Sequence, residues 1–200
     1  MQLKMWGLLR SRSNIYYIFE YDRGRVMRLK NDMILQINKA AKGDAAGMVE
    51  FLNLIGGESD NLLFGANGFH MAAEAEEIFI ENLLESDVSA LLVGKIEDEI
   101  VCVGSIMTSP KERISHQAEL SISVKKKYWG LGIGTYLMEA MISFAKRNGQ
   151  TEILHLGVKN DNINAINLYK KMGFYEVGIH KNFFKIEGNY YDEILMDLYL

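Results

Sequence analysis

The stretch YWGLGIGTYLMEAM, residues 128–141, places three glycines within five positions and then continues as an apolar pattern of helical period. Gly130, Gly132 and Gly134 follow a strand-like segment that ends at Val124, so they form a turn from a strand into a helix. Such a turn leaves backbone N–H groups uncovered at the positive end of the helix, where they can bind phosphate. A side chain there would hold the anion away and exclude some backbone dihedrals. A packing turn explains the same spacing, so the glycines alone do not show whether this turn binds phosphate.

The composition is typical of a globular chain: the 200 residues are 48% hydrophobic and 24% charged. Cys102 is the single cysteine, which excludes an internal disulfide and gives no metal-binding cysteine pair. We therefore expect a cytoplasmic protein without a bound metal. No apolar run reaches about 18 residues, so we expect no membrane span. The net charge of −4 gives no reason to expect a nucleic acid as partner.

The pattern of the chain changes near Met33. Residues 1–32 carry seven basic and three acidic side chains, a net charge of +4, so the remainder carries −8 within the total of −4. Because this segment lacks helical periodicity, we interpret residues 1–32 as an appendage and residues 33–200 as the domain. Residues 33–200 alone are then expected to keep the stability and cofactor affinity of the full chain. The alternative is that residues 15–21 add an edge strand or a dimer contact.

The periodicity from residue 33 onward predicts a mixed α/β sheet in the order strand, two helices, three strands, helix, strand, helix, two strands. Strands are expected at residues 33–41, 90–96, 100–107, 116–124, 152–158, 174–186 and 190–200, and helices at 44–55, 72–84, 134–148 and 162–172. In the strand before the glycine turn, Glu119, Ser121 and Ser123 alternate with apolar residues. One face of this strand is therefore expected to be buried and the other polar.

Two motifs together resemble the GCN5-related N-acetyltransferase (GNAT) superfamily: AELSISVKKKYWGLGIG at residues 118–134 and VKNDNINAINLYKKMGF at residues 158–174. The second fits the family pattern at Asn162, Ala165, Leu168, Tyr169, Gly173 and Phe174. The resemblance covers residues 33–200 and implies an α/β (α+β) fold. Its mixed, mostly antiparallel central sheet is flanked by helices, and the central strands splay to hold the cofactor. Trp129 departs from the pattern, which often has Arg or Gln there.

The resemblance implies an acetyl-CoA-dependent N-acetyltransferase that passes the acetyl group directly to an amine in a ternary complex. Acetyl-CoA is then the cosubstrate, with its diphosphate on the glycine turn and its pantetheine arm paired with the strand before it. The implied cofactor-binding residues are Ile122, Ser123, Val124, Trp129, Gly130, Leu131, Gly132, Ile133, Gly134, Thr135 and Asn162. Asn162 taken alone fits a helix cap equally well. Residues 125–127, all lysine, are expected to add positive charge beside the turn.

Acetyl transfer to an amine requires a base and an acid. An alkylammonium with a pKa near 10.4 is rarely neutral at pH 7, and a general base contributes roughly 10²–10⁴-fold. By resemblance, Glu119 is expected to be the base, directly or through water, and Tyr169 the acid that protonates the departing thiolate. Each has a plain alternative, as a solvated strand carboxylate and as a core tyrosine.

The remaining candidates carry less weight. Glu58, Asp60 and Phe64 either line the acceptor pocket or form an ordinary surface loop. His116 either assists the base or is simply solvated, and Cys102 between two valines is expected to be a buried, inert thiol.

Other functions remain open for the same residues. One is a non-catalytic acyl-CoA-binding sensor, and another is an O-acyltransferase or an enzyme that uses a longer acyl chain. The presence of both Glu119 and Tyr169 favours the N-acetyltransferase. The charge of −8 favours a cationic acceptor, either a small-molecule amine or a peptide amine. A homodimer is common in the family, but the sequence indicates no interface.

Overall fold

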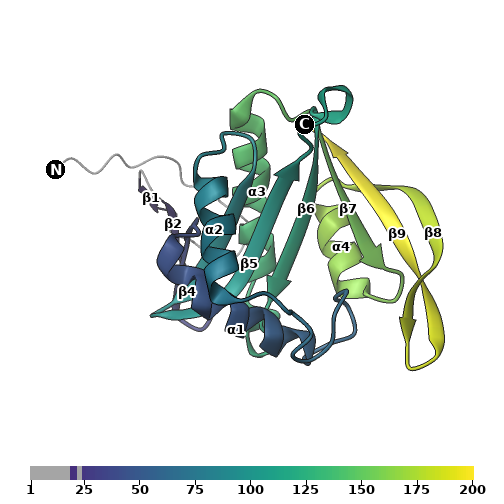
Figure 1. The fold of residues 1–200 in the computed structure, drawn as a ribbon, viewed down its shortest axis with the longest axis horizontal. Coiled ribbons are helices and arrows are strands. Elements are labelled where there is room, and N and C mark those ends of the chain that lie inside the picture. The colour runs from purple at the N-terminus through teal and green to yellow at the C-terminus, as the bar shows by residue number, and fades with distance from the viewer. Residues whose placement is uncertain (1–18, 22–23) are drawn as a thin grey trace.

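The computed structural model describes residues 19–21 and 24–200, which form one sheet with helices on both faces (Figure 1). The strands are β1 (Phe19–Tyr21), β2 (Gly24–Arg28), β3 (Ile34–Lys39), β4 (Ala90–Ile96), β5 (Glu99–Thr108), β6 (Gln117–Val124), β7 (Ile153–Lys159), β8 (Tyr175–Ile186) and β9 (Asn189–Tyr199). The helices are α1 (Ala45–Gly56), α2 (Ala73–Leu84), α3 (Ile133–Asn148) and α4 (Ile163–Lys171). From β3 onward these are the predicted elements, with ends shifted by one or two residues.

The described strands lie in the order β1-β2-β3-β4-β5-β6-β7-β9-β8. Only β6 and β7 among these neighbours run parallel, while the other pairs are antiparallel. The predicted mixed, mostly antiparallel sheet is therefore confirmed. A parallel pair requires a crossover connection, and here the glycine turn and α3 provide it.

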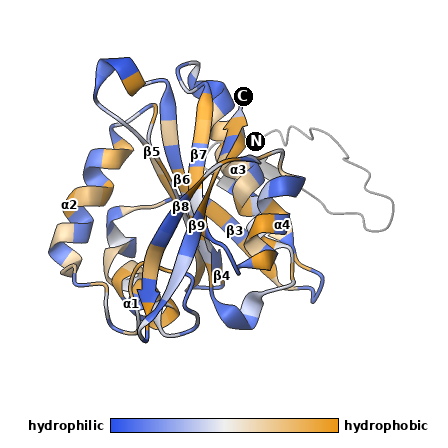
Figure 2. Ribbon diagram, turned by 90° about the vertical axis from the view of Figure 1, so that its right-hand side faces the viewer, coloured by the Kyte–Doolittle hydropathy of each residue, from blue (hydrophilic) through white to orange (hydrophobic). Residues whose placement is uncertain are grey.

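Two apolar clusters cover the two faces of the sheet. Helices α1 and α2 lie on one face, with Phe51 and Ile80 packed against residues of β4 and β5. Helices α3 and α4 lie on the other face (Figure 2). The apolar stripe of α3 enters this second cluster through Leu137, Met138 and Met141, which are fully buried. Helical spacing of apolar residues thus packs α3 directly behind β5 and β6.

Residues 24–32 are joined to the sheet rather than separate from it. β2 pairs with β3 over five residues, from Gly24 opposite Asn38 to Arg28 opposite Ile34. Met27 and Leu29 are buried in the cluster on the α3 side. The expected boundary at Met33 therefore falls inside the packed part of the chain, and we place it before Gly24. β1 lies beside β2 as an edge strand, while residues 15–18 lie outside the described residues.

Candidate active site

The central strands β6 and β7 separate after three residue pairs. Gln117–Glu119 pairs with Ile153–His155, and the described strands have no further pairing with each other. On their outer sides both strands stay paired, β6 with β5 and β7 with β9. The inner backbone edge of β6 after Glu119 therefore has N–H and C=O groups that a ligand can pair with. The predicted splay of the central strands is confirmed.

The glycine turn ends the open edge of β6 and begins α3. Gly130 and Gly132 have positive φ angles of 77° and 90°, a region that glycine adopts at little cost. Gly132 is the N-cap residue of α3, so no side chain caps this helix. The first N–H groups of a helix have no partner within it. Those of Ile133, Gly134 and Thr135 are therefore available to an anion at the positive end of the helix dipole.

Gly134 serves a different purpose, which is packing. A Cβ atom on Gly134 would lie 3.1 Å from Cδ2 of Leu168 in α4 and 4.0 Å from Cδ1 of Ile122 in β6. The glycine turn, the open strand and the second motif thus meet at this residue. Gly134 therefore agrees with the packing explanation, and the phosphate-binding explanation for Gly130 and Gly132 stays a prediction.

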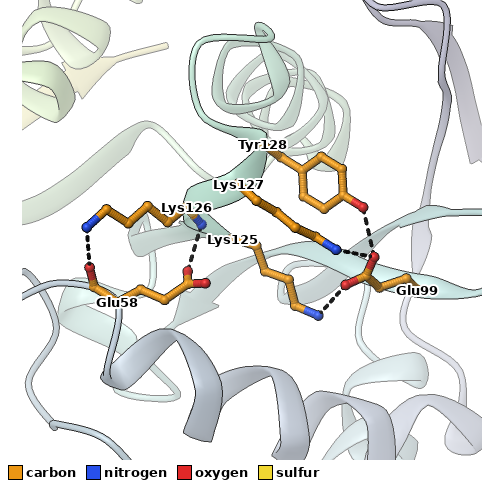
Figure 3. A network of polar contacts seen from close by, with 6 residues as sticks. All are labelled: Glu58, Glu99, Lys125, Lys126, Lys127 and Tyr128. Atoms are coloured by element: carbon orange, nitrogen blue, oxygen red, sulfur yellow. Dashed lines mark hydrogen bonds and ion pairs between the residues drawn. The ribbon is translucent and has the colours of Figure 1, made fainter.

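The lysines beside the turn are held by two glutamates (Figure 3). Lys125 and Lys127 form ion pairs of 2.8 and 2.9 Å with the two carboxylate oxygens of Glu99, and the Tyr128 hydroxyl also donates to Glu99. Hydrogen bonds from Lys125, Lys127 and Tyr128 hold the pKa of Glu99 down at about 2 against the opposing effect of burial. Glu99 carries one negative charge against the two positive charges of Lys125 and Lys127, so the expected contribution of these lysines to the positive charge beside the turn stays a prediction.

Glu58, at the start of the loop after α1, holds the turn from the other side. Its carboxylate accepts the backbone N–H of Lys126 at 2.6 Å, and its carbonyl oxygen accepts from Lys126 Nζ at 3.3 Å (Figure 3). Glu58 therefore contacts the glycine-turn region. In the same loop the rings of Phe64 and Phe69 lie 5.6 Å apart.

Trp129 stands where the family pattern often has Arg or Gln, and its indole N–H is a hydrogen-bond donor. Its indole Nε1 donates to the carbonyl oxygen of Val124 at 2.7 Å, while 45% of the residue stays exposed. This bond ties the turn to the end of β6. It also occupies one carbonyl of the open strand, the one at Val124. Backbone groups alternate along β6, so those of Ile122 face the open edge, whereas those of Ser123 face Val103 of β5.

The polar face of β6 lies on the sheet face where α1 and α2 pack. Ala118 and Leu120 are buried toward α3, and Glu119 and Ser121 are exposed on the opposite face. The Ser121 hydroxyl lies 2.7 Å from the Ser105 hydroxyl of β5. The structure therefore presents Glu119 at the point where β6 and β7 separate, without assigning it a role.

Helix α4 positions Tyr169 and Asn162. Tyr169 is 7% exposed, and its ring lies 6.0 Å from that of Phe174. Burial raises the pKa of Tyr169 to about 12, so the phenol stays protonated at neutral pH. The Asn162 side chain accepts the N–H of Ala165 at 3.3 Å, which makes it the N-cap of α4. Contact of Asn162 with a cofactor stays a prediction.

Sequence reasoning missed one carboxylate near Glu119. Glu193 in β9 has a side chain only 14% exposed, and a Cβ on Gly157 of β7 would overlap its carboxylate, with Cδ at 2.6 Å. Burial raises the pKa of Glu193, His180 opposes the shift, and the charge of Glu119 adds to it. In the sequence Glu193 follows Asp192 and precedes the apolar run ILM at residues 194–196. Its significance depends on the pairing of β7 with β9, which the sequence does not specify.

The other candidates have ordinary surroundings. Cys102 is fully buried, and burial raises its pKa to about 12, so this thiol is inert. His116 lies 3.3 Å from the side chain of Gln117. His155 has a buried Nδ1 that lacks a hydrogen-bond partner in the described part of the chain. No helix among the described residues is long and apolar enough to cross a membrane.

Comparison with known proteins gives the class. A model of the acetyltransferase (GNAT) family matches residues 60–174, which include β6, the glycine turn and α4. The chain belongs to this family. It is an N-acetyltransferase that uses acetyl-CoA, and the uncapped, glycine-lined start of α3 fits the diphosphate of that cosubstrate.

Individual relatives act on α-amines by name. An N-alpha-acetyltransferase of Sulfurisphaera tokodaii is 34% identical in an alignment of 116 residues that covers 53% of this chain and 68% of that protein. The L-amino acid N-acetyltransferase AaaT of Escherichia coli is 28% identical over 130 residues, 65% of this chain and 80% of that protein.

Solved structures agree on the fold. An acetyltransferase of the GNAT family from Streptococcus pneumoniae superposes with a TM-score of 0.81 at 32% identity, covering 83% of this chain and 99% of that chain. A putative acetyltransferase from Salmonella typhimurium, solved with its cofactor acetyl-CoA, superposes with a TM-score of 0.73 at 20% identity. That match covers 83% of this chain and 94% of that chain, and it shows likeness of fold.

Proposed function

We propose that this protein acetylates the α-amino group of an amino acid or of a peptide N-terminus by direct transfer from acetyl-CoA in a ternary complex. The observation that carries the proposal is the separation of β6 from β7 beside an uncapped glycine turn. An extended ligand can pair with the open edge of β6 while its anionic end lies on the N–H groups of α3. Acetyl-CoA has this combination of an extended arm and a diphosphate.

The diphosphate is proposed to bind the N–H groups between Gly130 and Thr135, with the pantetheine arm running back along β6. Ile122 supplies backbone partners to the arm, because Trp129 already holds the carbonyl of Val124 and the backbone of Ser123 faces β5. The thioester then lies toward the point where the two strands separate. Glu119 lies at this point, because its pairing with His155 is the last one between β6 and β7.

Glu119 is proposed to accept a proton from the acceptor ammonium, and Tyr169 to donate one to the departing thiolate. The raised pKa of Tyr169 supports the second role, because a phenol with a pKa of about 12 is protonated when the thiolate forms. Transfer in one complex needs no acetylated residue on the protein. The buried Cys102 thiol agrees with this, since its raised pKa makes it a poor nucleophile.

Two observations support the proposed acceptor class. Both relatives compared above act on α-amines by name. In addition, the sheet face beside the separated strands carries Glu119 and Glu193, whose negative charges favour a cationic amine. An α-amine has a lower pKa than a lysine side chain, so less free energy is needed to deprotonate it.

A turnover assay with matched acceptors tests the proposal. Full-length protein is given acetyl-CoA with free amino acids, short peptides, or the same peptides with a blocked N-terminus and one lysine. Free-thiol release and mass spectrometry of the product report transfer. We expect turnover with the free α-amines only. Binding of acetyl-CoA without turnover of any amine indicates a sensor, while turnover of hydroxyl acceptors or longer acyl-CoAs indicates the other acyltransferases.

A further inference from the structure

Glu193 is a carboxylate with little exposed surface, 14% of its side chain, in the second strand from the edge of the sheet. It lies on the same sheet face as Gly157, and the missing side chain of Gly157 creates the space that the carboxylate occupies. A buried carboxylate normally has hydrogen-bond donors, because leaving it without them costs free energy. Among the described residues, no group donates a hydrogen bond to the Glu193 carboxylate. Its nearest ionic partner, His180 Nδ1, is 3.8 Å away on a side chain that is 60% exposed.

The position of Glu193 relative to the separated strands is the second observation. Pairing of β6 with β7 ends at His155, and Gly157 is the next residue of β7 on the same face. The carboxylate above Gly157 therefore lies beside the point where the strands separate. Glu119 is close enough for its charge to act on Glu193. Two strands that are not neighbours, β6 and β9, thus direct a carboxylate each to the same region.

The charged groups around Glu193 come from every strand beside it. His180 lies opposite on β8, and Glu119 approaches from β6. Lys159 lies opposite Glu193 on β7, but its Nζ is bound to Asp161 at 2.6 and 2.7 Å and lies 3.7 Å from the centroid of the Tyr191 ring. The lysine opposite Glu193 is therefore directed elsewhere, and among the described residues the carboxylate keeps only the exposed His180 as an ionic partner, at 3.8 Å.

We propose that Glu193, in place of Glu119, contacts the acceptor amine and accepts its proton, so that the role given to Glu119 above changes from base to a group that holds the ammonium at the entrance. This inference rests on the proposed function. Glu193 takes one proton from the ammonium, the nitrogen forms the C–N bond to the acetyl carbon, and the C–S bond breaks. The thiolate takes a proton from Tyr169, and the second proton lost by the nitrogen restores that phenol through water. The products are the amide, the free thiol and a protonated Glu193 that solvent deprotonates.

Burial makes Glu193 a better base than an exposed carboxylate, since a higher pKa means a stronger attraction for the proton. The base must be ionised before it can act. The rate of the wild-type protein is therefore expected to fall as the pH falls through the raised pKa of Glu193. This fall in rate at low pH, the acidic limb of the pH–rate profile, is the measurement that reports on Glu193.

The decisive variant is Glu193→Gln, which keeps the shape and removes the base. We expect kcat to fall by about 10²–10³-fold, with the KM for acetyl-CoA unchanged and the acidic limb lost. The loss should be smaller for acceptor amines of low pKa, which are already neutral. Glu176→Gln, in the exposed ion pair of the same hairpin with Lys170, is the matched control and should retain wild-type kinetics.

Variants that move the carboxylate distinguish a catalytic role of Glu193 from a role in packing. Gly157→Ala should lower kcat with Glu193 still present, because the new Cβ displaces its carboxylate. The double variant Gly157→Asp with Glu193→Ala restores a carboxylate near the same point, and we expect at least a tenfold recovery of kcat over Glu193→Ala alone. Wild-type kcat and pH profile in Glu193→Gln overturn the assignment while leaving the acetyltransferase intact. Failure of the proposed function is a different result, because the wild-type protein itself would then release no thiol.

Discussion

Two glutamates on the same sheet, Glu99 and Glu193, have opposite surroundings. Glu99 at the start of β5 receives Lys125, Lys127 and Tyr128, and these donors hold its pKa at about 2 (Figure 3). Glu193 in β9 has no hydrogen-bond donor among the described residues, and burial raises its pKa. The side chain of Glu193 is the less exposed of the two, at 14% against 38%. The hydrogen-bond donors around each carboxylate, and not burial alone, account for the opposite directions of the two pKa shifts.

The difference extends to the two halves of the sheet. From β2 to β6 each strand is paired with the next, and the charges beside the glycine turn are used to hold it in place. From β6 to β7 the pairing stops after Glu119, and the polar groups beyond it have no partner from the neighbouring strand. Substitutions in the first half should therefore change stability, and substitutions around the gap should change binding and turnover.

The largest effect is expected at the glycine turn, where the two halves meet. Gly132→Asp adds a side chain and a negative charge where the diphosphate is proposed to bind. We expect the affinity for acetyl-CoA, measured by calorimetry, to fall by about 100-fold or more, which is roughly 2.7 kcal/mol. Gly149→Asp is the matched control, because Gly149 has a similar positive φ of 70° at the other end of α3. Equal losses of affinity in both variants would contradict the phosphate site.

A large loss of turnover is expected for Tyr169→Phe. The change removes the proposed proton donor and keeps the ring against Phe174, so kcat should fall by about 10²-fold with little change in the KM for acetyl-CoA. The raised pKa has a consequence for the wild-type protein. Tyr169 should cause no fall in rate up to about pH 11, since the phenol ionises only near pH 12. Tyr199→Phe, at an exposed ring, is the control. A Tyr169→Phe variant with full kcat would leave the tyrosine as a core residue.

The sequence predicted the parts of this site that depend on local pattern. Apolar alternation placed the strands from residue 33 onward, and helical spacing placed α3, because both signals come from residues close in the chain. The glycines and the LYKKMGF helix were recognisable as motifs, and the splay of β6 from β7 followed from the resemblance. Tyr169 and Glu119 were assigned in the same way, and their roles remain predictions.

The features that the sequence did not predict depend on contacts between residues far apart in the chain. Glu99 lies 26 positions before Lys125, and its ion pairs with Lys125 and Lys127 were not indicated by the sequence. Glu193 depends on a glycine 36 positions earlier, which becomes its neighbour only when β9 pairs with β7. β2 was missed because five residues with Arg at two positions lack clear alternation. For both glutamates, the residues that each one contacts in the fold define its role, and these contacts are not visible in the sequence.

A loss of stability without a loss of chemistry is expected at the N-terminal edge of the paired half. Leu29 is 3% exposed in the core, so Leu29→Ala should lower the free energy of unfolding by about 2–5 kcal/mol. For the same reason, a chain of residues 33–200 is now expected to be destabilised, in contrast to the expectation from the sequence. Denaturant unfolding measures both, with Leu63→Ala at a 77% exposed site as control. An unchanged midpoint in both variants would show that residues 24–32 add nothing to the fold.

The smallest effect is expected at Glu99 itself, and it depends on pH. A carboxylate whose pKa is lowered from 4.5 to about 2 stabilises the fold above about pH 4.5, and this contribution is lost as the pH falls toward 2. Because 38% of the side chain is exposed, solvent screening reduces the gain to about 1 kcal/mol. Glu99→Gln should therefore lower stability by this amount at pH 7 and flatten its decline between pH 4.5 and 2, while Glu97→Gln in the adjacent turn should not. Turnover sharpens the comparison, because Glu99→Gln should leave kcat and its acidic limb intact, whereas Glu193→Gln should remove both. If Glu99→Gln lost kcat as Glu193→Gln is expected to, the two carboxylates would not differ in function, and their different surroundings would have to be explained by packing alone.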